Sequence, residues 1–264
     1  MAMHPSERFM GFADIYEEAR PRVPEYPAEL LCRYLGHRPQ TVVDLGCGTG
    51  LSTAVWERYA DRVIGIEPSG DMLAVAGGKG NGVLTFLQGT GEATGLPGRT
   101  AELVVCSQAF HWMEPAAALR EVNRILKPGG IFAAVDYDWP PVMNWRVEQA
   151  FHQLRGKIRE VEASLPGAPD AGVRRPKDRH LANIRDSGYF AYTREVLFSH
   201  EEPCTRERLK RMMLSQSGVQ AILRTCPDRI RGELEAFAGA VEAGYGDDGF
   251  EITLCYRMRV GIKP

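Results

Sequence analysis

The chain has 264 residues, of which 44% are hydrophobic and 25% are charged. This length accommodates one large domain, or a core domain with a smaller cap, and the composition excludes disordered, collagen-like and fibrous proteins. The 32 Lys and Arg residues nearly balance the 34 Asp and Glu residues, so the net charge of −2 provides no basic field that would concentrate DNA or RNA. Nucleic acid is therefore not expected as a partner.

Membrane and export signals are missing from the sequence. No apolar run reaches the ~18–20 residues that a membrane-spanning helix needs, so no membrane partner is predicted. The first residues, MAMHPSERF, lack the charged and then apolar order of a secretory signal, which favours a cytoplasmic location. The six cysteines lie far apart without a C-x-x-C pair. We expect reduced core thiols, with no metal site and no disulfide framework.

Short apolar runs alternate with helical patterns in the first half of the chain. The helical patterns cover residues 26–35, 51–59, 68–76 and 115–126, and the connection at 88–101 is too rich in Gly and Pro for a good helix. The runs are rich in Val, Ile and Leu, as in strands covered on both faces, and they lie at 41–45, 62–66, 83–87, 103–107 and 131–136. Repeated β-α units predict a doubly wound parallel sheet.

Beyond Asp136 the pattern changes. Helical patterns at 145–163, 177–187, 205–223 and 228–242 surround a strand at 193–199. Residues 250–262 alternate strictly, which predicts an antiparallel strand with Arg257 and Arg259 on its polar side. The predicted fold is an α/β, Rossmann-like, seven-stranded and mostly parallel sheet with an antiparallel last strand and a helical cap or lid. The expected organisation is an arm and cofactor core at 1–140, an inserted cap at 141–190, and C-terminal strands with lid helices at 191–264.

The strongest local pattern is VVDLGCGTG at residues 42–50, where a strand leads through three glycines into a helix. Glycine permits a sharp turn and a close approach of the backbone to a ligand. Glu67 ends the next strand about twenty residues on, where a carboxylate accepts hydrogen bonds from ribose hydroxyls. Together these features predict an adenosine-containing cofactor.

The glycine spacing and Asp44 decide which cofactor is favoured. A dinucleotide fingerprint is G-x-G-x-x-G with the diphosphate at the helix N-terminus, whereas this loop is G-x-G-x-G with Asp44 two residues before the first glycine. A carboxylate repels a diphosphate but suits a ligand with ammonium and sulfonium charges. The predicted cofactor is S-adenosylmethionine, with S-adenosylhomocysteine as product. A nicotinamide cofactor and a purely structural turn are the alternatives.

With these motifs the sequence resembles the class I S-adenosylmethionine-dependent methyltransferases, in particular the branch called methyltransferase type 11 that acts on small molecules. The resemblance covers roughly residues 9–140 and rests on VVDLGCGTG, VIGIEPSGDML, GTGEATGLP, AELVVCSQAFHW and LREVNRILKPGG. Gly91 stands where similar proteins often have alanine, and Glu102 stands where aspartate is usual. Neither departure is expected to remove cofactor binding.

The resemblance implies a set of cofactor-binding residues. Asp44 and the glycine loop flank the methionine part, Glu67 holds the ribose, and a Tyr and an Arg of the N-terminal arm approach the carboxylate. Pro68 and Met72 are implied near the adenine, and three residues at its edge are Gly91, Glu92 and Ala93. The remaining implied residues are Tyr16, Arg20, Asp44, Gly46, Cys47, Gly48, Thr49, Gly50 and Glu67, with Ser107, Gln108 and Ala109 on the floor of the site.

Methyl transfer needs a base only if the acceptor arrives protonated. His111 follows the fourth strand at the carboxyl edge of the sheet, so it is the candidate base; its alternative is a histidine that only binds a loop or the cofactor. Asp136 and Asp138 are weaker candidates for the base.

Four aromatic residues are interpreted as a wall of the acceptor site or as core: Trp112, Tyr137, Trp139 and Trp145. Two basic patches, 174–179 and 206–211, are interpreted as solvated faces or as a site for an acidic acceptor.

The function expected from this resemblance is an enzyme that transfers methyl from S-adenosylmethionine to O, C or N of a small molecule. A non-catalytic module that binds S-adenosylmethionine is the main alternative, and an NAD-dependent oxidoreductase is disfavoured by the glycine spacing. The segment LKRMMLSQSGVQ is, by resemblance, a lid over the acceptor. The oligomeric state expected is a monomer or a homodimer.

Overall fold

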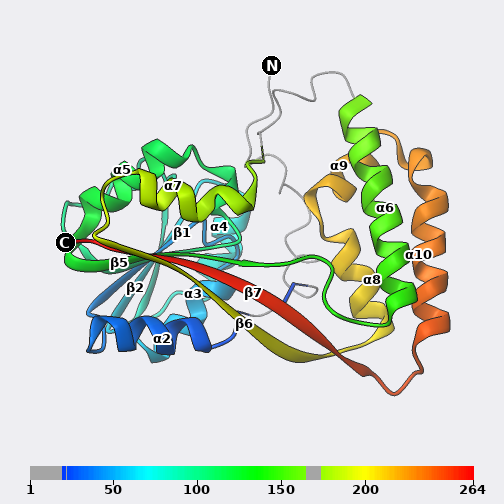
Figure 1. Ribbon diagram of the computed structural model, residues 1–264, viewed down its shortest axis with the longest axis horizontal. Coiled ribbons are helices and arrows are strands. Elements are labelled where there is room, and N and C mark those ends of the chain that lie inside the picture. Colours follow the sequence, from blue (N-terminus) through cyan, green and yellow to red (C-terminus); the bar gives the residue numbers. More distant parts are fainter. Residues whose placement is uncertain (1–19, 22, 165–173) are drawn as a thin grey trace. The chain divides into compact units, whose positions relative to one another are not determined.

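The computed structural model describes residues 20–21, 23–164 and 174–264 (Figure 1). The chain divides into two compact units. The first, here called the sheet unit, contains residues 23–137, 174–197 and 256–264. The second, the helical unit, contains residues 20–21, 138–164 and 198–255. Residues 174–197 thus pack with the sheet, and the domain limits expected at 140 and 190 stay a prediction.

A seven-stranded sheet is built in the order β3-β2-β1-β4-β5-β7-β6. β1 pairs in parallel with β2 and β4, β2 with β3, and β4 with β5, whereas β7 runs antiparallel to β5. The strands are β1 Thr41–Leu45, β2 Arg62–Glu67, β3 Leu84–Gln88, β4 Ala101–Ser107, β5 Leu126–Tyr137, β6 Tyr192–Cys204 and β7 Phe250–Ile262. The predicted fold class is confirmed. The order reverses between β1 and β4, which is where open α/β sheets bind ligands.

Helices cover both faces of the sheet. α2 lies on one side of the strands, and α5 and α7 lie on the other, where they pack together (Figure 1). α5 begins at Pro115 because the Glu114 carboxylate caps its first turn by accepting from the amides of Ala116 and Ala117. The bounds are α2 Tyr26–Leu35, α3 Leu51–Val55, α4 Gly70–Gly77, α5 Pro115–Ile125 and α7 His180–Asp186. The connection between β3 and β4 contains no helix, as its Gly and Pro content predicts.

The helical unit has its own apolar core. α6 packs against α9 and α10, and α10 packs against α8. The bounds are α6 Trp145–Ser164, α8 Arg206–Leu214, α9 Ser217–Thr225 and α10 Arg231–Gly244. The single helix predicted at 205–223 is two helices, because the backbone becomes extended at Gln216; the hydroxyl of Ser215, just before it, donates to the Met212 carbonyl. Met212, Met213 and Ser215 of the expected lid are buried in this unit.

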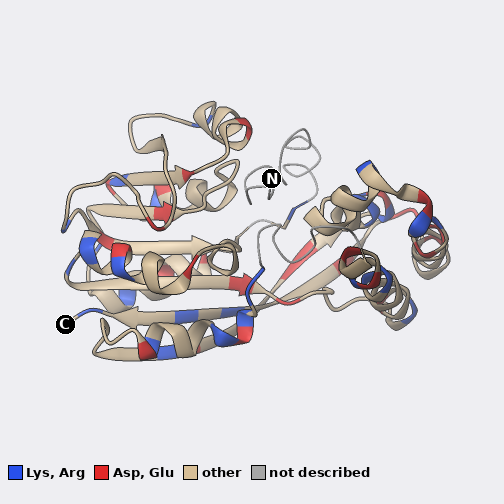
Figure 2. Cartoon of the chain, turned by 90° about the horizontal axis from the view of Figure 1, so that it is seen from above, with Lys and Arg blue, Asp and Glu red and all other residues tan. Residues whose placement is uncertain are grey.

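The charged side chains of the helical unit are largely paired with one another. Arg206 and Lys210 bind Glu242, Arg208 binds Glu202, and acidic and basic residues are mixed on its helices (Figure 2). The second basic patch is therefore a neutralised face and not a free cationic surface.

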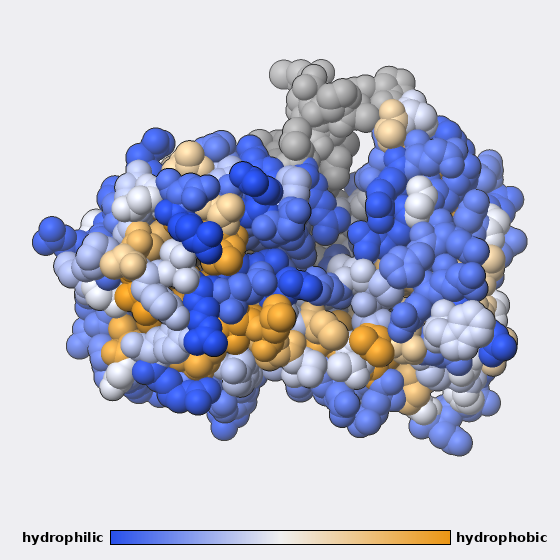
Figure 3. Space-filling view, viewed as in Figure 1, coloured by the Kyte–Doolittle hydropathy of each residue, from blue (hydrophilic) through white to orange (hydrophobic). Residues whose placement is uncertain are grey.

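The view in Figure 3 is mostly hydrophilic, and the exposed large apolar residues of the edge strand β6 are Tyr192 and Leu197. Among the helices of the described ranges, none has the length and apolarity to cross a bilayer.

We expect Gly65→Ala to destabilise the sheet unit. A Cβ at Gly65 in β2 would lie 2.7 Å from Phe86 Cδ1 and 2.8 Å from Cys47 Sγ, so the aromatic ring and the glycine loop must move. Overpacking of this kind costs about 1–3 kcal/mol, which urea denaturation measures. Gly77→Ala is the matched control, because its Cβ meets nothing within 4 Å and its stability should be equal or higher. Equal stability of both variants would contradict this packing.

Candidate functional site

The glycine loop joins β1 to α3 and is held in one conformation by left-handed glycines. Gly46, Gly48 and Gly50 have φ of +68°, +57° and +84°, which side chains other than glycine rarely adopt. A Cβ at Gly46 would collide with Ala109 at 2.5 Å and one at Gly50 with Phe86 at 3.0 Å, but one at Gly48 meets nothing within 4 Å. Packing therefore requires two of the glycines, and the third faces open space where a ligand fits.

Asp44 is the residue before the last of β1, beside this loop, and is completely buried. Its Oδ2 accepts from Ser52 Oγ at 2.7 Å and from Thr53 Oγ1 at 2.8 Å, but its Oδ1 has no hydrogen-bond partner. Burial raises the pKa of Asp44 to about 6, although the two hydroxyls oppose that rise. A buried carboxylate with one unpartnered oxygen fits a ligand that brings a positive charge.

Glu67 ties the loop to β2. Its Oε2 accepts from Gly48 N at 3.0 Å and its Oε1 accepts from Ser69 N at 2.9 Å. Burial raises the pKa of Glu67, and these two amides oppose the rise. Each carboxylate oxygen accepts more than one hydrogen bond, so ribose hydroxyls can still donate to Glu67. The residue predicted to hold the ribose is thus next to the loop predicted to hold the methionine part.

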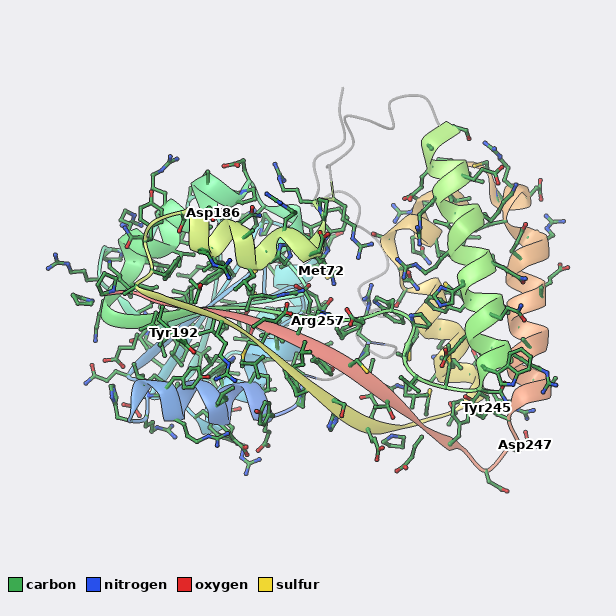
Figure 4. The ribbon with its side chains drawn as sticks, in the orientation of Figure 1. Met72, Asp186, Tyr192, Tyr245, Asp247 and Arg257 are labelled. Carbon is green, nitrogen blue, oxygen red and sulfur yellow. The ribbon has the colours of Figure 1, made fainter. Side chains whose placement is uncertain are left out.

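The other predicted cofactor residues of the sheet unit follow the ends of β2, β3 and β4. Met72 of α4, labelled in Figure 4, is buried and Pro68 is half-buried. At Gly91 an alanine Cβ would lie 2.8 Å from Met113 Cε, so the end of the Met113 side chain would have to move. The remaining positions are Ser107, which ends β4, and Glu92, Ala93, Gln108 and Ala109, which lie on the connections that leave these strands.

The N-terminal arm is described only in part. Tyr16 lies outside the described residues. Arg20 belongs to the helical unit, where its Nη2 donates to the Ser215 carbonyl at 3.1 Å and its guanidinium lies 5.8 Å from the centre of the Trp139 ring. The roles of Tyr16 and Arg20 toward a cofactor carboxylate stay predictions.

Beyond the loop, a second group of buried polar residues lies at the carboxyl ends of β4 and β5. His111 Nδ1 lies 3.7 Å from Asp136 Oδ1, and His180 Nε2 lies 3.6 Å from Asp136 Oδ2. All three side chains are at most 3% exposed. His111 follows β4 on a short 3₁₀ turn, Asp136 is in β5, and His180 begins α7. The edge of the sheet thus brings together residues that are about 70 positions apart in the sequence.

Two cations surround the same carboxylate. Lys177 Nζ lies 2.9 Å from Asp136 Oδ1 and also donates to Gln108 Oε1 at 2.8 Å. Arg259 Nη1 lies 3.1 Å from Asp136 Oδ2, and its Nε donates to Glu195 at 2.7 Å. Arg259 was expected on the polar, solvent side of the last strand, but it is only 3% exposed. Because its charge is compensated by Asp136 and Glu195, it tolerates burial.

These charges determine the protonation of the cluster. Burial raises the pKa of Asp136, but the neighbouring His111, the charge of Lys177 and His180 outweigh it and hold that pKa well below its usual range. Burial lowers the pKa of His111 to about 3 and that of His180 to about 4, with Asp136 acting in the opposite direction. At neutral pH, Asp136 is therefore ionised and both imidazoles are neutral.

The same three residues have the chemistry of metal ligands, and within the described residues they form the one such group. A divalent cation between them would lie close to the Lys177 ammonium and the Arg259 guanidinium, which already neutralise Asp136 and its neighbour Glu195. Like charges at this distance repel strongly in a buried site. The cluster therefore supplies its own cations and does not fit a metal ion.

His180 is the functional candidate that the sequence patterns missed. Lys177 was considered only as part of a basic patch. The sequence K-D-R-H places Lys177 and His180 three residues apart, so both reach the same side of one helical segment. That spacing is the signal that could have linked them, although nothing in the sequence shows that Asp136 faces this segment.

The aromatic residues predicted to wall an acceptor site are divided between different environments. Tyr137 is buried against Tyr256, and Trp112 packs beside His111 with Arg174 over its ring. Trp139 stacks on Phe151 within the helical unit, and Trp145 is 63% exposed there. Of the four, Trp112 and Tyr137 lie in the sheet unit near the histidine cluster.

Comparison with known proteins identifies the family. Residues 43–134 match the family model described as a methyltransferase domain. An uncharacterised methyltransferase of Mycobacterium tuberculosis is 39% identical over 116 residues, which are 44% of this chain and 46% of that protein. A "probable S-adenosylmethionine-dependent methyltransferase" of Saccharomyces cerevisiae, CRG1, is 30% identical over 58% of each chain. The match therefore spans only about half the length of these curated relatives.

Solved structures show the same fold. One described as a type II methyltransferase from Anaeromyxobacter dehalogenans superposes with a TM-score of 0.69 at 22% identity and covers 92% of this chain and 97% of its own. The YcgJ protein of Bacillus subtilis superposes with a TM-score of 0.56 at 19% identity over 91% of this chain and 99% of its own. The predicted family, its fold and S-adenosylmethionine as the cofactor of the family are confirmed. The resemblance to the S-adenosylmethionine-dependent methyltransferases is thus confirmed for residues 43–134, which match a methyltransferase domain.

Proposed function

We propose that this chain transfers a methyl group from S-adenosylmethionine to O, C or N of a small molecule by in-line displacement. The observation that carries the proposal is the glycine loop beside Asp44, a buried carboxylate with an unpartnered oxygen. A cationic amino-acid end satisfies that oxygen, whereas a diphosphate would be repelled by it. The family match supports the reaction type, and the acceptor class is our inference.

The chain's residues divide the work of holding the ligand. Asp44 and the loop around Gly48 bind the amino-acid end, Glu67 accepts from the ribose, and Pro68 and Met72 contact the adenine. When bound, S-adenosylmethionine supplies a methyl carbon activated by a sulfonium. The protein must then align acceptor, methyl and sulfur and exclude water, and such alignment supplies on the order of 7–11 kcal/mol.

His111 is proposed as the general base. Its imidazole is neutral at neutral pH because burial lowers its pKa to about 3, so a nitrogen lone pair is free at any pH where the protein works. The ionised Asp136 beside it offsets part of the cost of protonating it. A general base contributes ~10²–10⁴-fold to a rate, most when its pKa lies near the working pH, so the low pKa of His111 places its contribution in the lower part of that range. Asp136 itself is not proposed as the base, because its two oxygens are already paired with Lys177 and Arg259.

Two alternatives to methyl transfer are a different reaction on the same fold and binding of S-adenosylmethionine without turnover. The [4+2]-cyclase SpnF superposes with a TM-score of 0.54 at 17% identity, so this fold also hosts chemistry other than methyl transfer. A module that binds S-adenosylmethionine without turnover is the alternative that binding alone would leave. An NAD-dependent oxidoreductase is disfavoured by Asp44. Calorimetry with S-adenosylhomocysteine and with NAD, followed by turnover on a panel of hydroxyl, amine and carbon acceptors, separates the three functions.

A cytoplasmic location, the absence of a nucleic-acid partner and a monomeric or homodimeric state stay predictions.

Gly48→Asp should abolish binding of S-adenosylhomocysteine. The new side chain enters the open space beside the loop, and Asp tolerates the φ of +57°, so the backbone is little strained. We expect a loss of at least 100-fold in affinity by calorimetry, from steric exclusion of the ligand on the order of 3 kcal/mol. Gly36→Asp is the matched control, because Gly36 has φ +84° and open space at the end of α2. Retained affinity in Gly48→Asp would contradict the loop assignment.

Affinity for S-adenosylmethionine should fall as the pH drops through about 6, the pKa of Asp44. A cationic ligand binds the anionic form, so binding lowers this pKa, and affinity is constant above it and falls by up to ~10-fold per pH unit below it. Calorimetry between pH 5 and 8 measures the effect. Glu67 titrates in the same site, so Asp44→Asn should reduce the slope while Glu67→Gln retains part of it. A pH-independent affinity would show that no carboxylate faces the ligand.

His111→Ala should lower turnover by about 100-fold or more without changing affinity for S-adenosylhomocysteine, because the base is lost and the cofactor site is not. His152→Ala, at an exposed position of α6, is the control. Turnover by the native chain should show no loss near pH 6.5, since the pKa of His111 is far lower. Unchanged turnover in His111→Ala, on any acceptor that the native chain methylates, would remove the base assignment.

A further inference from the structure

Three buried ring nitrogens of one cluster have no hydrogen-bond partner: His111 Nδ1 and both ring nitrogens of His180. A buried polar atom without a partner costs roughly 1–3 kcal/mol. Such atoms are uncommon in native proteins and indicate a strain reservoir, a catalytic role or a missing ligand. The concentration of three of them around the Asp136 carboxylate points to a functional arrangement.

The geometry places the two imidazoles on opposite oxygens of that carboxylate. His111 Nδ1 lies 3.7 Å from Oδ1 and His180 Nε2 lies 3.6 Å from Oδ2. Both separations are longer than a hydrogen bond by less than 1 Å, and catalytic hydrogen bonds often shorten only when substrate is bound. The rings of His111 and His180 are nearly parallel, 15° apart with centroids 6.5 Å apart, as expected for two rings that face the same partner.

The Asp136 carboxylate is held and kept charged by contacts that do not involve the two histidines. Lys177 reaches Oδ1 and Arg259 reaches Oδ2, and Arg259 is itself held by Glu195. Asp136 and Arg259 come from adjacent antiparallel strands, in which Asp136 pairs with Arg257 and Ala134 with Arg259, so the two side chains are diagonal neighbours on one face of the sheet. The position of the carboxylate is therefore set by the sheet register and not by the histidines.

We propose that Asp136 is the positioning residue for His111 in the methyl transfer. Asp136 Oδ1 accepts the Nδ1 proton of His111, which leaves the Nε2 lone pair for the acceptor, while His180 donates to Oδ2. This inference rests on the proposed function and deepens it. It follows the general arrangement in which a carboxylate fixes the tautomer of a histidine base.

The step balances as follows. The electron pair of the X–H bond of the acceptor becomes the new bond from X to the methyl carbon, and the proton passes from X to His111 Nε2. The bond between the methyl carbon and sulfur breaks, and its electron pair stays on sulfur. The proton later leaves to water. The substrate class is therefore an acceptor that arrives with a proton on the reacting atom, such as a hydroxyl, and not a tertiary amine or a thioether.

Histidine tautomers test the inference without a known acceptor. The full chain is labelled with ¹⁵N-histidine, and long-range ¹H–¹⁵N spectra at pH 7 are recorded with and without S-adenosylhomocysteine, with His111→Gln and His180→Gln used for assignment. We expect His111 to be neutral with its proton on Nδ1. In Asp136→Asn we expect at least half of the His111 population to move its proton to Nε2. Asp186→Asn, on the exposed end of α7, is the control and should change nothing.

Three outcomes decide the matter. The inference is overturned if native His111 carries its proton on Nε2, or if Asp136→Asn does not change the His111 tautomer. It is also overturned if the protein binds one tight equivalent of Zn²⁺ or Mn²⁺ that His180→Ala removes. If Asp136→Asn does not fold, the native tautomer and Lys177→Met decide, because loss of Lys177 should raise the pKa of His111. Calorimetry with S-adenosylhomocysteine reports the proposed function separately, since the tautomers are also measured in the free protein.

Discussion

Buried carboxylates at the carboxyl edge of the sheet are the constraint on which the candidate site depends. Asp44 lies near the end of β1, Glu67 ends β2 and Asp136 lies near the end of β5, and all three are buried. Taking a carboxylate out of water costs several kcal/mol unless it is paired or hydrogen-bonded. Each is compensated differently: Asp44 by two hydroxyls, Glu67 by two backbone amides, and Asp136 by two cations. The loop, the 3₁₀ turn and the start of α7 take their conformations around these groups.

The difference in compensation gives two chemically similar residues different tasks. Hydroxyls from Ser52 and Thr53 are neutral, so the charge of Asp44 is not balanced within the protein and burial raises its pKa to about 6. A cationic ligand completes that balance. Lys177 and Arg259 already balance Asp136, whose pKa is lowered, so this carboxylate stays ionised whatever binds. One aspartate is therefore suited to bind a ligand, and the other is suited to orient a neighbouring side chain.

Much of the fold could be predicted from local patterns, because the strands are continuous apolar runs and the glycine loop has a specific spacing. The bounds predicted for 41–45 and 250–262 are those of β1 and β7. Arg259 was placed on the solvent side because strict alternation assigns polar residues to water, and only the pairing with β5 shows that its side meets Asp136. His180 was missed for the same reason. Its role depends on a contact across the sheet edge that no local spacing encodes.

The two aspartates also bracket the movement of charge in the proposed reaction. Before transfer, the positive charge is on the sulfonium, which the proposal places near Asp44; after transfer it is on the proton that His111 accepts, beside Asp136. Burial and the charges of both Asp44 and Asp136 raise the pKa of the Cys106 thiol in β4. The charges of both aspartates therefore act on this part of the sheet. The negative charges are thus already in place at both ends of the path, and no group has to be reorganised as the positive charge moves. A site with this preorganisation favours acceptors that release a proton, because only these deliver the charge to Asp136.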